Sequence, residues 1–105
     1  MKRGDIFLHK FKEPDKTRPV LILTRNGAIS GLNAITVIPI TSSIRDLSSQ
    51  VILTQDDGMR EVCAINIDWI QTVPKNKLAP YLAHLSDKKM DEVFEAMKFA
   101  FGFDK

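Results

Sequence analysis

The sequence predicts a mainly β (α+β) protein, a small SH3-like half-open β-barrel of five to seven short strands with a C-terminal α-helix. Two observations lead to this prediction. Short apolar, β-branched runs alternate with polar turns that contain Gly or Pro, which is typical of strands. Only the last segment repeats its apolar residues at helical spacing. With 105 residues and no repeat or linker, we expect a single domain over residues 1–105.

The N-terminal half is expected to contain three strands, at residues 5–11, 18–25 and 34–40. A polar turn with Pro14 separates the first two, and Asn26-Gly27 opens the next loop. Because proline cannot donate a hydrogen bond to a neighbouring strand, Pro39 is expected close to the end of its strand.

The second half is expected to contain a short strand at 50–54 and two strand-like pieces at 61–67 and 69–73, joined by a helical turn near Asp68. Residues 41–49 read as an irregular polar turn, with Ile44 and Leu47 expected to anchor it.

A helix is predicted after Ser86, which is a good N-cap, with Asp87 favourably placed in the first turn. Gly102 is expected to end this helix, and Phe99 is expected opposite its apolar stripe, as a candidate contact with a second chain. The expected stripe consists of Met90, Val93, Phe94, Met97, Ala100 and Phe101.

Composition excludes several classes of protein. No apolar stretch approaches the ~18 residues of a membrane span, and the basic start lacks the apolar region of a signal peptide. We therefore expect no membrane association and a cytoplasmic location. The single cysteine, Cys63, excludes an internal disulfide and reads as a buried small hydrophobe.

Charge is unevenly distributed along the chain. Residues 1–26 hold seven Lys or Arg against three Asp or Glu, whereas residues 27–105 hold eight against ten. A basic first hairpin can attract phosphates. On charge alone, however, lysines that simply keep a small protein soluble explain the pattern better.

Arg18 and Thr41 are the main candidates for chemistry, because Arg18 opens one apolar run and Thr41 follows another. The residue before a proline is extended, and a guanidinium can hold a phosphate with two parallel hydrogen bonds. Thr41 supplies a hydroxyl where polar residues begin. The alternatives are an ion pair of Arg18 with Asp15 or Asp68, and a turn stabilised by Thr41.

Other candidates are weaker. Three roles stay open for Asp68, which are an ion pair with Arg18, a contact with a ribose and the cap of a turn. For Trp69 the alternatives are stacking on a base and a position in the core. His9 and His84 have ordinary settings, so a two-histidine mechanism is disfavoured. No nucleotide-binding loop or metal-ligand spacing is present in the sequence, and no metal or cofactor is expected.

The order of several motifs over nearly the full length resembles the MazF/PemK toxin family of bacterial endoribonucleases. The motifs are Arg3-Gly4-Asp5-Ile6, Arg18-Pro19-Val20-Leu21-Ile22, Pro39-Ile40-Thr41-Ser42, Gly58-Met59, residues 68–73 and Lys77-Leu78. The resemblance implies a homodimeric, metal-independent mRNA interferase that cuts single-stranded RNA at a short sequence and is blocked by a cognate antitoxin. It also implies 2′-hydroxyl attack, which leaves a cyclic or 3′-phosphate and a 5′-hydroxyl.

Matched residue by residue, the resemblance implies that Arg18 and Thr41 are catalytic. Asp68 falls where some members have an acidic residue near the RNA, and the expected RNA contacts are Asp68, Ser42, Asn66, Trp69 and Lys16. The chain departs from the family pattern at Asn66, Trp69 and Cys63 and in the short loop at 12–17. These departures bear on base preference more than on activity, because Arg18 and Thr41 remain.

Two other functions stay open at this point. The CcdB type of toxin has the same barrel and poisons DNA gyrase through its C-terminal helix, and Phe99 and Phe103 keep that possibility alive. A barrel that binds RNA or protein without cutting is the other. The pair of Arg18 and Thr41 distinguishes the endoribonuclease from the gyrase-binding toxin, since a gyrase-binding protein does not need this pair.

Overall fold

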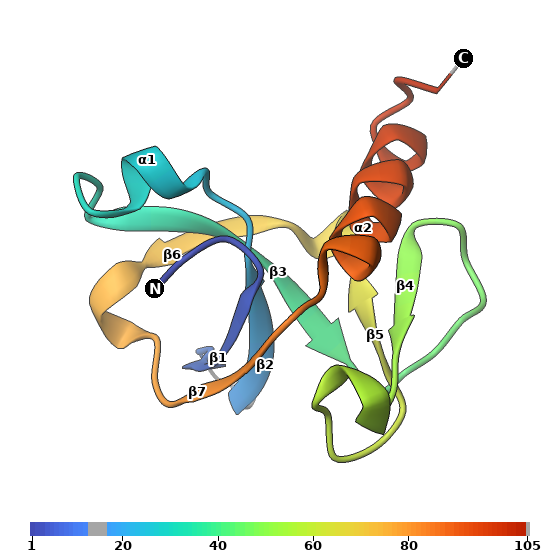
Figure 1. The fold of residues 1–105 in the computed structure, drawn as a ribbon, viewed down its shortest axis with the longest axis horizontal. Coiled ribbons are helices and arrows are strands. Elements are labelled where there is room, and N and C mark those ends of the chain that lie inside the picture. Colours follow the sequence, from blue (N-terminus) through green and yellow to red (C-terminus); the bar gives the residue numbers. More distant parts are fainter. Residues whose placement is uncertain (13–16, 105) are drawn as a thin grey trace.

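The computed structural model describes residues 1–12 and 17–104. Within them, an antiparallel sheet curls into a half-barrel against the C-terminal helix α2 (Asp87–Ala100), as Figure 1 shows. The sheet consists of β1 (Asp5–Lys10), β2 (Thr17–Ile22), β3 (Ala34–Thr41), β4 (Gln50–Leu53), β5 (Cys63–Asn66), β6 (Gln71–Pro74) and β7 (Tyr81–His84). The predicted fold class is confirmed.

In the described connections between these strands there are four single turns of helix. They are α1 (Asn26–Ile29) and the 3₁₀ turns η1 (Gln55–Asp57), η2 (Ile67–Trp69) and η3 (Lys75–Lys77). The helical turn predicted near Asp68 is therefore confirmed as η2.

Strand β3 organises the sheet. The strand order is β4-β5-β3-β2-β1-β7, and β6 also pairs with β3. On one side β3 pairs with β2, and on the other its first half pairs with β6 and its last two residues with β5. Because one strand serves two neighbours in succession, the sheet bends around it, and the end of β3 lies where these strands meet.

The core has two parts, on opposite faces of the central strands. On β2, Leu21 packs into the cluster that α2 covers, whereas Val20 and Ile22 pack into a second cluster beneath β6 and α1. A strand buried on both faces needs apolar residues at consecutive positions, and this explains the unbroken apolar run at residues 20–23.

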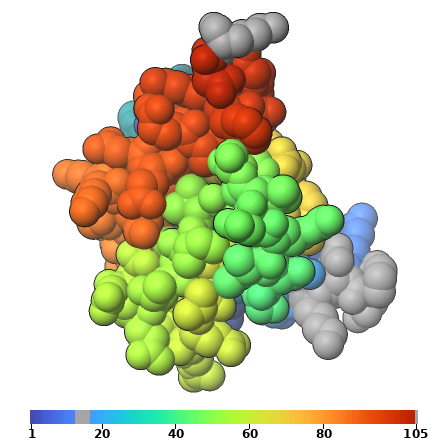
Figure 2. Space-filling model, turned by 90° about the vertical axis from the view of Figure 1, so that its right-hand side faces the viewer, coloured from blue at the N-terminus to red at the C-terminus, as the bar shows by residue number. Residues whose placement is uncertain are grey.

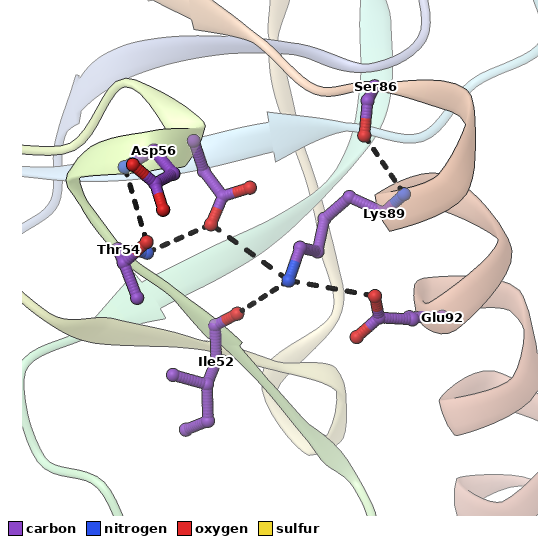
Figure 3. A network of polar contacts seen from close by, with 7 residues as sticks. Ile52, Thr54, Asp56, Ser86, Lys89 and Glu92 are labelled. Carbon is purple, nitrogen blue, oxygen red and sulfur yellow. Dashed lines mark hydrogen bonds and ion pairs between the residues drawn. The ribbon is translucent and has the colours of Figure 1, made fainter.

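Helix α2 begins as predicted, since the Ser86 hydroxyl accepts a hydrogen bond from the Lys89 N–H at 3.1 Å. Its first turn is tied to the β4 region, as Figure 3 shows. Lys89 Nζ donates to the Ile52 carbonyl at 3.2 Å and lies 3.9 Å from Asp57 and 3.6 Å from Glu92. Among the described residues, no helix is long and apolar enough to span a membrane.

Some expectations were wrong. Phe94 and Phe101, assigned to the buried stripe of α2, are 57% and 42% exposed, whereas Val93 and Ala96 are buried. Ile44 and Leu47, expected to anchor the segment after β3, are 42% and 45% exposed. That segment, in green, lies below α2 on the face shown in Figure 2. Apolar periodicity locates a helix, but which residues the rest of the fold covers depends on tertiary packing.

Candidate functional site

The register of β2 and β3 brings the two main candidates to the same end of the sheet. The ladder pairs Ile22 with Val37 and Val20 with Pro39. The ladder ends there, and continuing its register by two residues on each strand would set Arg18 across from Thr41, which does not line the hollow beside Arg18. The meeting of a cation and a hydroxyl at these neighbouring strand ends stays a prediction.

Arg18 is half-buried, and its Cζ lies 5.4 Å from the centre of the Trp69 ring. At this distance the indole attracts the guanidinium as a cation–π pair. The alternative ion pair with Asp68 is not found, since the Asp68 carboxylate accepts a hydrogen bond from the Ser49 hydroxyl at 2.7 Å. No carboxylate of the described residues lies within ion-pair distance of Arg18, and Asp15 is outside those residues.

Thr41 is 5% exposed, and its Oγ1 accepts a hydrogen bond from the Ser43 N–H at 3.0 Å. The alternative use of this hydroxyl, to hold the turn after β3, is therefore observed. A hydroxyl that accepts one hydrogen bond still has its own proton to donate. The turn fixes Oγ1 in place at the strand end without using up that proton.

A hollow of about 160 Å³ opens beside Arg18, and we call it the Arg18 hollow. Its walls are formed by five residues from different elements. They are Phe11 just after β1, Arg18 of β2, Pro39 of β3, Trp69 of η2 and Gln71 of β6. Trp69 is 47% exposed, so of its two alternatives the position in the core is wrong. Phe11 and Gln71 carried no predicted role; Gln71 reaches the hollow because β6 pairs Gln71 with Val37 of β3.

The remaining predicted contacts are more dispersed. Ser42 and Asp68 are exposed; Ser42 lies in the turn that Thr41 holds, and Asp68 lies on η2. Asn66 is 7% exposed at the end of β5 and does not line the Arg18 hollow. Lys16 lies outside the described residues.

His9 is Arg18's direct partner in the β1–β2 ladder. It is buried, and its Nδ1 has no hydrogen-bond partner among the described residues. Burial lowers the pKa of His9, and the positive charge of Lys77 lowers it further. The imidazole is therefore neutral at pH 7 and adds no second cation beside Arg18.

The other titratable candidates are structural. His84 Nδ1 lies 2.8 Å from the buried Asp5 carboxylate and so ties β7 to β1. Burial raises the pKa of the Cys63 thiol, with smaller contributions from Glu61 and Asp57, which keeps the thiol protonated and unreactive. Over residues 1–12 and 17–104, no group of His, Cys, Asp and Glu is arranged to hold a metal ion.

The curled half-barrel with a C-terminal helix is the fold of one class of small protein. The family model described as "PemK-like, MazF-like toxin of type II toxin-antitoxin system" matches residues 2–101. The chain belongs to this family. The comparisons thus support the first of the two toxin hypotheses and not the gyrase-poisoning CcdB type.

Individual relatives agree. Endoribonuclease MazF3 of Mycobacterium tuberculosis is 34% identical over 90 residues, which is 86% of this chain and 87% of the relative. The solved M. tuberculosis toxin MazF-mt6 is 32% identical, with a TM-score of 0.87 over 96% of this chain and 99% of its own.

A further solved structure supports the fold alone. A mycobacterial endoribonuclease in complex with its cognate antitoxin has a TM-score of 0.87 at 21% identity, over 100% of this chain and 98% of its own. The whole barrel, α2 included, is therefore shared with solved members of the family.

Proposed function

We propose that this chain is the toxin of a toxin–antitoxin pair and acts as a sequence-selective, metal-independent endoribonuclease on single-stranded RNA. The observation that carries the proposal is at the start of β2, where a half-buried guanidinium lies over an indole and, among the described residues, has no carboxylate within ion-pair distance. A permanent cation in this setting is available to a phosphate. The family match and the endoribonuclease relatives support the same activity.

In the proposed reaction, the ribose 2′-oxygen attacks the adjacent phosphorus as its proton leaves to a base. The bond from phosphorus to the 5′-oxygen breaks, and that oxygen takes up a proton. The products are a 2′,3′-cyclic phosphate, which water can open to a 3′-phosphate, and a 5′-hydroxyl. Negative charge grows on the non-bridging oxygens, where a positioned cation lowers the barrier most.

Arg18 is proposed to bind this phosphate and to stabilise the developing charge. A guanidinium keeps its proton in proteins and is a poor base, so Arg18 is not assigned the 2′-hydroxyl proton. Thr41 is proposed to orient the phosphate or the 2′-hydroxyl through its remaining O–H. The base stays unassigned between Asp68 and water, and Asp68, Ser42, Asn66, Trp69 and Lys16 are the proposed RNA contacts.

The proposed partners follow from the family. They are a cognate antitoxin, encoded with the toxin, and a second copy of this chain, for which Phe94 and Phe99 of α2 offer exposed apolar area (57% and 50% exposed). Light scattering at micromolar concentration is expected to give twice the chain mass of 11.9 kDa. Because the proposed substrate is mRNA, we also propose a cytoplasmic site of action.

The test of activity is direct. Purified protein is incubated with a long defined RNA in excess EDTA, and the fragment ends are mapped. We expect discrete fragments with 5′-hydroxyl and cyclic or 3′-phosphate ends. Intact RNA from folded protein would refute the nuclease, and trapped gyrase–DNA complexes in a parallel assay would then favour the CcdB-type activity.

A further inference from the structure

The Arg18 hollow has the size and the walls of a site for one planar ring system. Pockets for drug-sized ligands measure roughly 300–1,000 Å³, and this hollow measures about 160 Å³. Its walls include two aromatic rings, a guanidinium and a side-chain amide. Aromatic and guanidinium planes stack on nucleobases, while amides form hydrogen bonds with base edges.

Trp69 supplies the largest aromatic surface of this hollow. A single exposed aromatic residue is ordinary by itself. Here, however, the 47% exposed indole lies beneath the guanidinium that is proposed to hold the phosphate. A base that stacks at Trp69 would therefore be the neighbour of that phosphate.

Gln71 presents a fixed amide on the same wall. Its Nε2 donates to the Trp69 carbonyl at 3.2 Å, which restricts the side chain to one orientation. Among the described residues, no hydrogen bond to its Oε1 is found. Within the part of the chain that the structure describes, this oxygen and the second N–H of the amide have no partner and can face the edge of a bound base.

We propose that the Arg18 hollow binds one nucleobase of the RNA, next to the phosphate held by Arg18, with Trp69 stacking on the base and Gln71 selecting its edge. This inference rests on the proposed endoribonuclease function and extends it to base recognition. In this proposal the stack of Arg18 and Trp69 has two roles, because the guanidinium contacts the phosphate and the indole contacts the neighbouring base.

Binding can be measured through Trp69 itself, because it is the only tryptophan of the chain. The probe is a single-stranded oligoribonucleotide in which every 2′-hydroxyl is methylated, so that it has no nucleophile and stays intact. We expect it to quench the tryptophan emission with the same midpoint as the anisotropy of a labelled copy. Saturating anisotropy with unchanged emission would overturn the stacking.

Variants separate the two contacts. Trp69→Leu keeps an apolar side chain but no π-face, so the affinity for the probe should fall on the order of tenfold, and Trp69→Phe should recover part of it. Gln71→Leu should change the relative cleavage rates of RNAs that differ in a single base by on the order of tenfold, because it removes the polar edge contact.

Gln55→Leu is the matched control for Gln71→Leu. The Gln55 amide also donates to a backbone carbonyl, that of Arg60 at 3.1 Å, but Gln55 lies on η1 and does not line the Arg18 hollow. Its replacement should leave base preference as in the wild type. Equal changes in base preference in both variants would show a general effect on folding or binding and would overturn the assignment of Gln71.

The outcomes distinguish a failure of the proposed base site from a failure of the proposed nuclease activity. Wild-type protein that is folded but leaves RNA intact refutes the proposed function. Wild-type cleavage, together with unaltered affinity in Trp69→Leu and unaltered base preference in Gln71→Leu, overturns the base site and leaves the nuclease standing. Quenching by a purified antitoxin but not by the RNA probe would assign the hollow to a protein partner and would also overturn the proposal.

Discussion

Two cations of this molecule, Lys89 and Arg18, are held in opposite ways. Lys89, on α2, donates to a carbonyl and lies near two carboxylates, so its charge is matched within the fold. Arg18, on β2, rests on an indole and has no carboxylate within ion-pair distance among the described residues. A π-face positions a cation without neutralising it. The comparison teaches that the charge of Lys89 is used within the fold, whereas no described carboxylate matches that of Arg18, which we propose binds an anion from outside.

Replacing Arg18 is the most severe test of this contrast between the two cations. Replacing a group that stabilises charge in a transition state costs on the order of 10²–10³ in rate, so Arg18→Ala should cleave RNA at least a hundredfold more slowly. Its melting temperature should change little, since no ion pair of Arg18 is found among the described residues. Arg60→Ala, an exposed arginine outside the Arg18 hollow, is the control. Equal rates for Arg18→Ala and the wild type would remove Arg18 from the site.

Thr41 should show a similar loss that depends on its hydroxyl. Thr41→Val keeps the shape of the buried side chain but removes Oγ1, and we expect a fall in cleavage rate on the order of a hundredfold. Thr41→Ser restores the hydroxyl and should recover most of the rate. Because Val also removes the hydrogen bond from Ser43, circular dichroism must show that both variants are folded. If Ser is as slow as Val, the hydroxyl is not the group that matters.

Lys89 should show the reverse of Arg18. Lys89→Ala loses one hydrogen bond and two weak ion pairs at a side chain that is 20% exposed. We expect the free energy of unfolding to fall by about 1 kcal/mol. For a domain of this size, that corresponds to a fall of about 4–8 °C in melting temperature. RNA cleavage at 25 °C should stay near the wild-type rate. A large loss of activity in a folded Lys89→Ala protein would end the contrast between the two cations.

His9 gives the smallest expected effect. Burial lowers its pKa below the ordinary value of 6.5, so the unfolded chain takes up this proton more readily than the folded one. The free energy of unfolding should therefore fall as the pH drops from 6.5 towards the lower pKa of His9 in the folded protein. Above pH 6.5, His9 should add no pH dependence to the stability. Denaturant unfolding of wild type and His9→Phe between pH 7 and 5 tests this. Parallel pH curves would exclude the effect.

The sequence predicted the fold well where the signal is local. β-Branched runs located β2 and β3, and Ser86 marked the start of α2. Strand β7 was missed, because its four residues follow Pro80 without a strong apolar pattern and form a strand only through pairing with β1. Which parts of α2 stay exposed, as at Phe94, likewise depends on the rest of the fold.

For the site, the sequence named Arg18 and Thr41, and the family resemblance placed Trp69 among the RNA contacts, but no pattern predicted that the indole lies beneath Arg18 or that Gln71 lies beside it. The indole beneath Arg18 and the amide of Gln71 come from η2 and β6, about fifty residues further along the chain. They reach Arg18 only through the pairing of β6 with β3, a non-local register that no short motif encodes. The neutral His9 beside Arg18 could be found in the same way, from the register of β1 and β2.

Chemical rescue of Arg18→Ala tests most directly whether a guanidinium bound to the scissile phosphate drives the reaction. Single-turnover cleavage of one defined RNA is measured with increasing guanidinium chloride, and with urea and sodium chloride as neutral and ionic controls. The account predicts a saturable rise in rate with guanidinium alone, in Arg18→Ala and not in Thr41→Val. A rate that guanidinium leaves unchanged, in a folded variant that binds RNA as tightly as the wild type, would contradict it.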